Sequence, residues 1–121
     1  MLRAIAAGTL AFIMFAGTAR AEPIVYTWTG FGANVAGSSR CPSYKMTINV
    51  TVDGENVKGV FQQESRPERK FETTLGKNGA IKTVAMVSGG GVMDVIGQIK
   101  EGDSKIKLDG YCIFEGKLAR K

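Results

Sequence analysis

Apolar and polar residues alternate along much of the chain after residue 22. In the segment 45–53, with the sequence KMTINVTVD, every second residue is apolar and the residues between them are polar or charged. A period of two places the apolar side chains on one face of a β-strand. The pattern therefore predicts a strand with one buried face.

The dipeptide Gly54-Glu55 follows this segment and predicts a hairpin. If these residues form the centre of a type II′ turn, Val52 lies opposite Val57 and Ile48 lies opposite Phe61. Moving the turn back by one residue places Val52 opposite Glu55, which breaks the agreement between the two apolar faces. We therefore expect 45–53 to pair with 56–63 in the first register.

A second Gly-acid pair, Gly102-Asp103, predicts another hairpin near the end of the chain. With this pair as the turn, Ile99 lies opposite Ile106, and Gly97 lies opposite Leu108. Turn residues and β-branched runs elsewhere bring the expected number of strands to about eight, with no helix longer than one turn. The remaining predicted strands are 24–31, 71–75, 81–87 and 111–118.

Strands of this length joined by tight sequential turns favour an up-and-down meander. Closure of such a sheet into a barrel removes its exposed edges. We therefore expect an all-β fold: a single small antiparallel barrel of about eight strands, formed by residues 22–121. The interior of such a barrel is filled by side chains or holds one small ligand. The sequence leaves both alternatives open.

The first 21 residues have the layout of a secretory signal peptide. Arg3 is followed by an apolar run from Ala4 to Ala16, and Ala19-Arg20-Ala21 matches a cleavage site. The apolar run is short for a membrane span. Cleavage of 21 of the 121 residues leaves 100, and the loss of two arginines lowers the net charge from +5 to +3. We therefore expect a periplasmic or secreted protein with no membrane span in its mature form.

Cys41 and Cys112 are the two cysteines of the chain. In an oxidising compartment they have one intramolecular pairing available, and we expect that disulfide to tie the beginning of the sheet to its end. A catalytic thiol and an intermolecular pair are the alternatives. The chain contains no histidine that could stabilise a thiolate.

Composition narrows the classes of function. A chain without histidine has no imidazole base and no histidine metal ligand. The carboxylates are scattered, and Gly89-Gly90-Gly91 lacks the Lys-Ser/Thr of a phosphate-binding loop. A net charge of +3 gives no indication of nucleic-acid binding. We expect a protein that is not an enzyme and that uses no cofactor and no metal.

Two groups of residues are candidates for binding. The aromatic residues on predicted strands can form either the core or the lining of a small apolar pocket. The segment 66–70 is the densest charge cluster and is either a solvated hairpin tip or a basic loop that contacts an acidic partner. The aromatic residues are Tyr26, Trp28, Phe61, Phe71 and Phe114, and the basic residues are Arg66, Arg69 and Lys70.

The segments around Trp28-Thr29-Gly30, Cys41-Pro42 and Gly110–Phe114 resemble those of small exported proteins of alphaproteobacteria. More broadly, the chain is similar to calycin-like barrels. Lipocalins carry Gly-x-Trp on their first strand, whereas here Gly30 follows Trp28. The chain also resembles periplasmic barrels that inhibit lysozymes or proteases. The lysozyme inhibitors use a Ser-Gly-x-x-Tyr loop, but Val92 stands at the Tyr position of segment 88–92, so no inhibitory residue is carried over.

These observations favour a non-catalytic binding protein. The first hypothesis is that the barrel binds a small apolar ligand in its interior or a protein partner at its loops. The alternative is a periplasmic inhibitor of a hydrolase, either a lysozyme or a protease, that presents the loop 32–43, 65–70 or 88–91.

Overall fold

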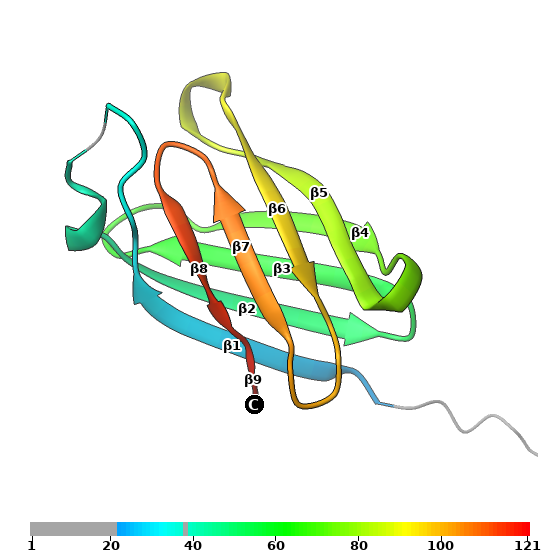
Figure 1. Ribbon diagram of the computed structural model, residues 1–121. Helices are drawn as coiled ribbons and strands as arrows, with labels where there is room; N and C mark the ends of the chain where they lie inside the picture. The colour runs from blue at the N-terminus through cyan, green and yellow to red at the C-terminus, as the bar shows by residue number, and fades with distance from the viewer. Residues whose placement is uncertain (1–21, 38) are drawn as a thin grey trace, which may run out of the picture.

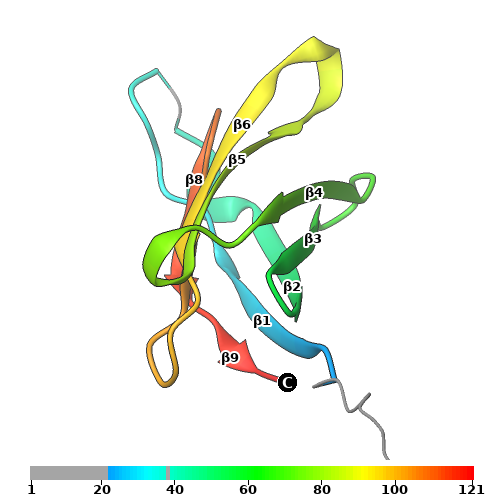
Figure 2. The same ribbon diagram turned by 90° about the vertical axis from the view of Figure 1, so that its right-hand side faces the viewer.

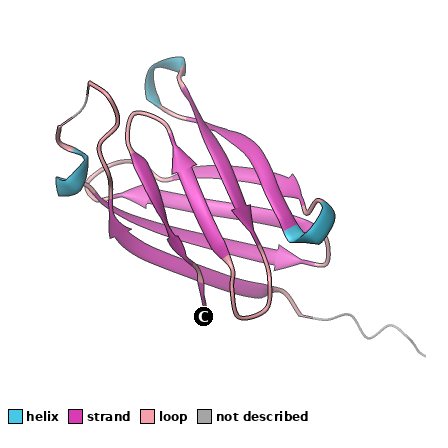
Figure 3. Ribbon diagram, viewed as in Figure 1, coloured by secondary structure: helices cyan, strands magenta, loops and turns pink. Residues whose placement is uncertain are grey.

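The computed structural model describes residues 22–37 and 39–121, so the predicted signal peptide lies outside the described residues. Strands make up most of the described chain, and three short 3-10 turns lie between them (Figure 3). The elements are β1 (Ile24–Phe31), η2 (Cys41–Ser43), β2 (Lys45–Asp53), β3 (Asn56–Gln63), β4 (Arg69–Thr74), η3 (Lys77–Gly79), β5 (Ala80–Met86), η4 (Ser88–Gly90), β6 (Val92–Gln98), β7 (Lys105–Asp109), β8 (Ile113–Lys117) and β9 (Ala119–Arg120).

The strands form two antiparallel sheets that lie face to face (Figure 1). The first has the order β4-β3-β2-β1-β9, and the second has the order β5-β6-β7-β8. The predictions of an all-β antiparallel fold and of sequential hairpins are confirmed. The single eight-stranded barrel is not: within the described residues no ladder joins β4 to β5, and the sheet does not close.

The first predicted hairpin has the expected register. Val52 pairs with Val57, and Ile48 pairs with Phe61. Gly54 has a φ of +65°, whereas Glu55 is not among the residues with positive φ. This combination fits a II′ turn, in which only the first central residue needs the left-handed region that glycine tolerates.

The predicted register of the second hairpin is wrong by two residues. Gly97 pairs with Ile106, and Val95 pairs with Leu108. The loop is longer than a two-residue turn because the buried Ser104 side chain binds back to it: its Oγ accepts from the Lys100 N–H and donates to the Lys100 carbonyl, both at 3.0 Å. A shift of two residues keeps every side chain on its predicted face, because the strand period is also two.

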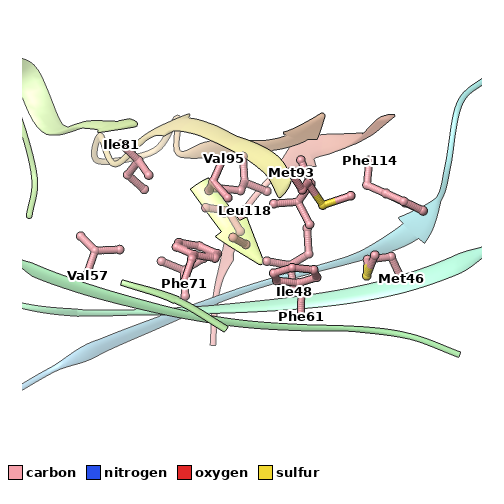
Figure 4. Close-up of a cluster of buried hydrophobic side chains, with 14 of the residues drawn as sticks. Met46, Ile48, Val57, Phe61, Phe71, Ile81, Met93, Val95, Phe114 and Leu118 are labelled. Atoms are coloured by element: carbon pink, nitrogen blue, oxygen red, sulfur yellow. The ribbon is translucent and has the colours of Figure 1, made fainter. Parts of the chain in front are cut away.

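The hydrophobic core lies between the two sheets. Figure 4 shows Met93 and Phe114 on one sheet facing Met46 and Ile48 on the other. Met46 and Ile48 occupy alternating positions of 45–53 that the sequence predicts to be buried, and all four side chains are buried. The same alternation leaves the other faces of both sheets toward solvent.

The two sheets are joined along one long side of the molecule, at β1, β8 and β9. After β1 the chain reaches the second sheet, where Ala33 forms a β-bridge with Ile113 at N···O distances of 2.7 and 3.1 Å. Beside this bridge, Cys41 and Cys112 form the predicted disulfide, and both residues are buried. At the other end of β8, the chain passes through Leu118 into β9, which pairs with β1. We call this side the closed side.

The opposite side is open. Strands β4 and β5 are joined by the turn 75–79 and diverge from it, as Figure 2 shows. Each of them is the edge of its own sheet. The two sheets therefore separate progressively toward the end of the molecule that carries the β3–β4 and β5–β6 turns.

Trp28 spans the closed side. A Cβ atom added at Gly116 of β8 would lie 2.0 Å from the indole Nε1 of Trp28, so the ring lies directly against the Gly116 backbone. Trp28 also shares the inward face of β1, because it pairs with the buried Ile48. The absence of a side chain at Gly116 is thus what allows the two sheets to approach here.

We predict that the double variant Cys41→Ala/Cys112→Ala is less stable than the wild type by about 2–4 kcal/mol in urea unfolding, because the bridge restricts a large loop of the unfolded chain. The cysteines are separated by 71 residues in sequence. An unfolding midpoint equal to that of the wild type would contradict a stabilising role for the bridge.

We also predict that Gly116→Ala lowers the free energy of unfolding by about 1–3 kcal/mol, because its methyl group must displace the Trp28 ring. Gly76→Ala is the matched control, since the nearest atom to its added Cβ lies at 3.6 Å. The control is expected to change stability by less than about 0.5 kcal/mol. Equal effects of the two substitutions would contradict the packing of Trp28 on Gly116.

Candidate functional site

A cleft of about 360 Å³ lies between the sheets at the diverging end. Its size falls within the range of about 300–1,000 Å³ that is usual for small-molecule sites. One side is open to solvent, because its lining includes the exposed Val92 and Tyr111. The lining residues are Tyr44, Met46, Phe61, Gln63, Arg66, Pro67, Arg69, Val87, Val92, Met93, Gly110, Tyr111, Cys112 and Phe114. We call this space the inter-sheet cleft.

The connections around the inter-sheet cleft gather at one end because alternate turns of a meander lie at the same end of its sheet. The turns β3–β4, β5–β6 and β7–β8 all contribute lining residues. The loop after β1 joins them through Tyr44, whose N–H donates to the Cys41 carbonyl at 3.0 Å and whose carbonyl accepts from Gly32 at 3.1 Å. Rigid strands thus position four connections around one opening.

The floor of the inter-sheet cleft is apolar. Phe61 and Met46 come from the first sheet, and Phe114 and Met93 come from the second. All four side chains are nearly inaccessible to solvent, with exposed fractions of 2–7%. A ligand that entered here would contact aromatic rings and flexible thioethers, which adapt to irregular apolar shapes.

Two arginines lie at the rim of the inter-sheet cleft. Arg69 begins β4 and pairs with the buried Phe61, so it shares the inward face of the sheet and is half-buried. Arg66 is exposed in the preceding turn, where its N–H donates to the Gln63 carbonyl at 2.9 Å and its carbonyl accepts from Gln62 Nε2 at 2.8 Å. These bonds fix the backbone from which Arg66 extends.

The structure divides the predicted aromatic group. Phe61 and Phe114 line the inter-sheet cleft, whereas Tyr26, Trp28 and Phe71 do not. Phe71 packs behind Phe61, with ring centroids 6.3 Å apart. Tyr26 and Trp28 are half-buried against the core on the side of β1.

The predicted basic group is also divided. Arg66 and Arg69 line the inter-sheet cleft, but Lys70 does not. Lys70 alternates with the inward Arg69 and pairs with Val60 on the outer face of the first sheet. The two candidate groups, which the sequence treats separately, therefore meet at one site.

Tyr44 and Tyr111 are lining residues that the sequence reasoning missed. Each is close in sequence to a cysteine, Tyr44 to Cys41 and Tyr111 to Cys112. The disulfide brings both segments to the same end. The expected Cys41–Cys112 bridge was therefore the signal that could have identified these two tyrosines as neighbours.

The described residues that line the inter-sheet cleft offer apolar surface, two cationic side chains and a few neutral polar groups. Of the lining residues that the structure describes, none carries a carboxylate, and the charged ones are Arg66 and Arg69. Among the described residues, no cluster of three histidine, cysteine or acidic side chains could hold a metal ion. The lining also lacks the paired carboxylates that many general acid–base sites use.

A second apolar surface covers the outer face of the β5–β6 hairpin. Met86 and Val92 are cross-strand partners, both more than half exposed, and Val92 also lies at the mouth of the inter-sheet cleft. Val84 and Ile96 continue this surface, which we call the outer patch. Lys82 and Asp94 interrupt the outer patch, whereas the floor of the inter-sheet cleft is apolar.

Comparison of the chain with models of protein families, with curated proteins and with solved structures gave no significant match. The resemblance to calycin-like barrels therefore stays a prediction. A functional assignment has to come from the geometry of the molecule.

In the part of the chain that is described, no helix is long and apolar enough to cross a bilayer.

Proposed function

We propose that this protein is a non-catalytic binding protein that takes a small apolar molecule into the inter-sheet cleft. The observation that supports the proposal is the open space between two sheets whose apolar faces are elsewhere in contact. Small-molecule sites are typically concave and mainly apolar, with a few polar groups that orient the ligand. The inter-sheet cleft has an apolar floor and a polar rim of this kind.

We further propose that the protein acts in the periplasm or outside the cell, after removal of residues 1–21. The Cys41–Cys112 disulfide supports this location, because such bonds persist in oxidising compartments and are rare in the cytosol. The sequence of residues 1–21 supports it independently.

The test is the binding of Nile red, a neutral apolar dye, followed by fluorescence. We expect Val87→Trp to weaken dye binding about ten-fold, because Val87 is half-buried, lines the inter-sheet cleft, and would place an indole ring in its volume. Val84→Trp is the matched control: Val84 lies on β5, the strand that ends just before Val87, but on the outer patch. The control is expected to bind as the wild type does.

Thermal unfolding of both variants establishes that they are folded. If Val84→Trp abolished dye binding while Val87→Trp left it unchanged, the dye would bind at the outer patch and the proposal would be wrong. Absence of dye binding by the wild type would contradict it as well.

Inhibition of a lysozyme or protease is the second candidate function. It is supported by the gathering of the loop after β1 with the β3–β4 and β5–β6 turns around one end (Figure 1). A surface made of several loops on a rigid sheet is suited to contact an enzyme's active site. Stoichiometric loss of activity in a panel of lysozymes and proteases, unaffected by Val87→Trp, is the result that would favour inhibition over ligand binding.

A further inference from the structure

We infer that the ligand of the inter-sheet cleft is a free, single-chain organic anion: a carboxylate with an apolar tail of about ten carbons. This inference rests on the proposed function, because it names the chemistry of the molecule that would occupy the same cleft. Three features of the described residues carry it: the charge of the rim, the character of the floor, and the volume between them.

The charge of the rim selects the sign of the ligand. Arg66 and Arg69 are the charged lining residues, and both are cations. The acids of the same turn, Glu64 and Glu68, do not line the inter-sheet cleft. A guanidinium presents paired N–H donors that match a carboxylate geometrically, and such charge-assisted hydrogen bonds are stronger than neutral ones.

The position of the arginines relative to the floor selects an amphipathic shape. Arg69 on β4 pairs with Phe61 on β3, so a charged side chain and a floor side chain are neighbours on the inward face of the sheet. A molecule whose head contacts Arg69 would therefore have its tail against Phe61 and the neighbouring methionines. Gln63, Tyr44 and Tyr111 supply further polar groups around the opening.

The volume of the inter-sheet cleft suits a short single chain. A space of about 360 Å³ accommodates about twelve groups of the size of a water molecule, at about 30 Å³ each. Decanoate has about that number of non-hydrogen atoms. The two long tails of a membrane phospholipid require much more space, so the inference commits to a free molecule and not to a lipid surface.

The experiment compares two probes that share a ten-carbon tail, sodium decanoate and decyltrimethylammonium bromide, by isothermal titration calorimetry below their micelle concentrations. We expect decanoate to bind at least about ten-fold more tightly than the cation, because the rim attracts one head group and repels the other. Its affinity should fall as salt is added, since part of the rim is exposed to solvent.

Charge-removing variants locate the effect. Arg69→Gln is expected to weaken decanoate binding about ten-fold, and Arg66→Gln about three-fold, because exposed charges interact more weakly than half-buried ones. Lys70→Gln is the matched control: it removes one positive charge from the same segment, but on the outer face. We expect it to change the affinity by less than about two-fold. Nile red binding by Lys70→Gln should equal that of the wild type.

The outcomes separate the inference from the proposed function. Equal affinity for the two probes, or equal effects of Arg69→Gln and Lys70→Gln, would overturn the inference while Nile red binding still supported an apolar site. Failure of decanoate, the cation and Nile red to bind would overturn both. Co-sedimentation with phosphatidylglycerol vesicles without binding of decanoate would also overturn the inference, in favour of a membrane surface.

Discussion

The junction along the closed side is the constraint on which the rest of the structure depends. There the Ala33–Ile113 bridge and the Cys41–Cys112 disulfide hold one end of β8 to the segment after β1. At its other end, the chain passes from β8 into β9 and adds to the first sheet beside β1. Fastening the two sheets along one side sets their separation there. Because β4 and β5 form no ladder, their separation on the opposite side is free to increase.

This asymmetry explains how a domain of this size combines a packed core with a cleft. Near the closed side, the Trp28 ring packs against Gly116, and side chains from both sheets are in contact. Toward the open side, the diverging sheets leave more space than the side chains of Phe61, Met93 and Phe114 fill. A filled interior and an open space thus occur in different parts of one molecule. Figure 4 shows side chains of the packed part.

The local features of the fold could be predicted from the sequence. The period of two in 45–53 and the Gly54-Glu55 turn were sufficient for the strands and for their register, because both depend on neighbouring residues. The register after Gln98 could not be predicted from the Gly102-Asp103 pair, since it depends on the hydrogen bonds of the Ser104 side chain with Lys100. Because the register differs from the predicted one by two residues, Ile106 and Leu108 still lie on the buried face.

The candidate site was less accessible to sequence reasoning, because it depends on contacts between distant segments. Phe61 and Arg69 were identified separately, and only the β3–β4 pairing places them together. Lys70 is excluded from the inter-sheet cleft because it lies on the outer face of β4. Trp28 lies on the inward face of β1 but is excluded because its ring packs on Gly116 at the closed side. The local turns favour a continuous meander, so they did not indicate that β4 and β5 diverge and that the strands divide into two sheets.

The most direct test of the account is a measurement of nuclear Overhauser effects between bound decanoate and methionine methyl groups labelled with ¹³C. Met46 and Met93 line the inter-sheet cleft, whereas Met86 lies on the outer patch, so the described chain contains its own control. The account predicts effects from the decanoate chain to the methyl groups of Met46 and Met93 and none to Met86. Effects confined to Met86, or saturable binding of decanoate without any effect on Met46 and Met93, would contradict it.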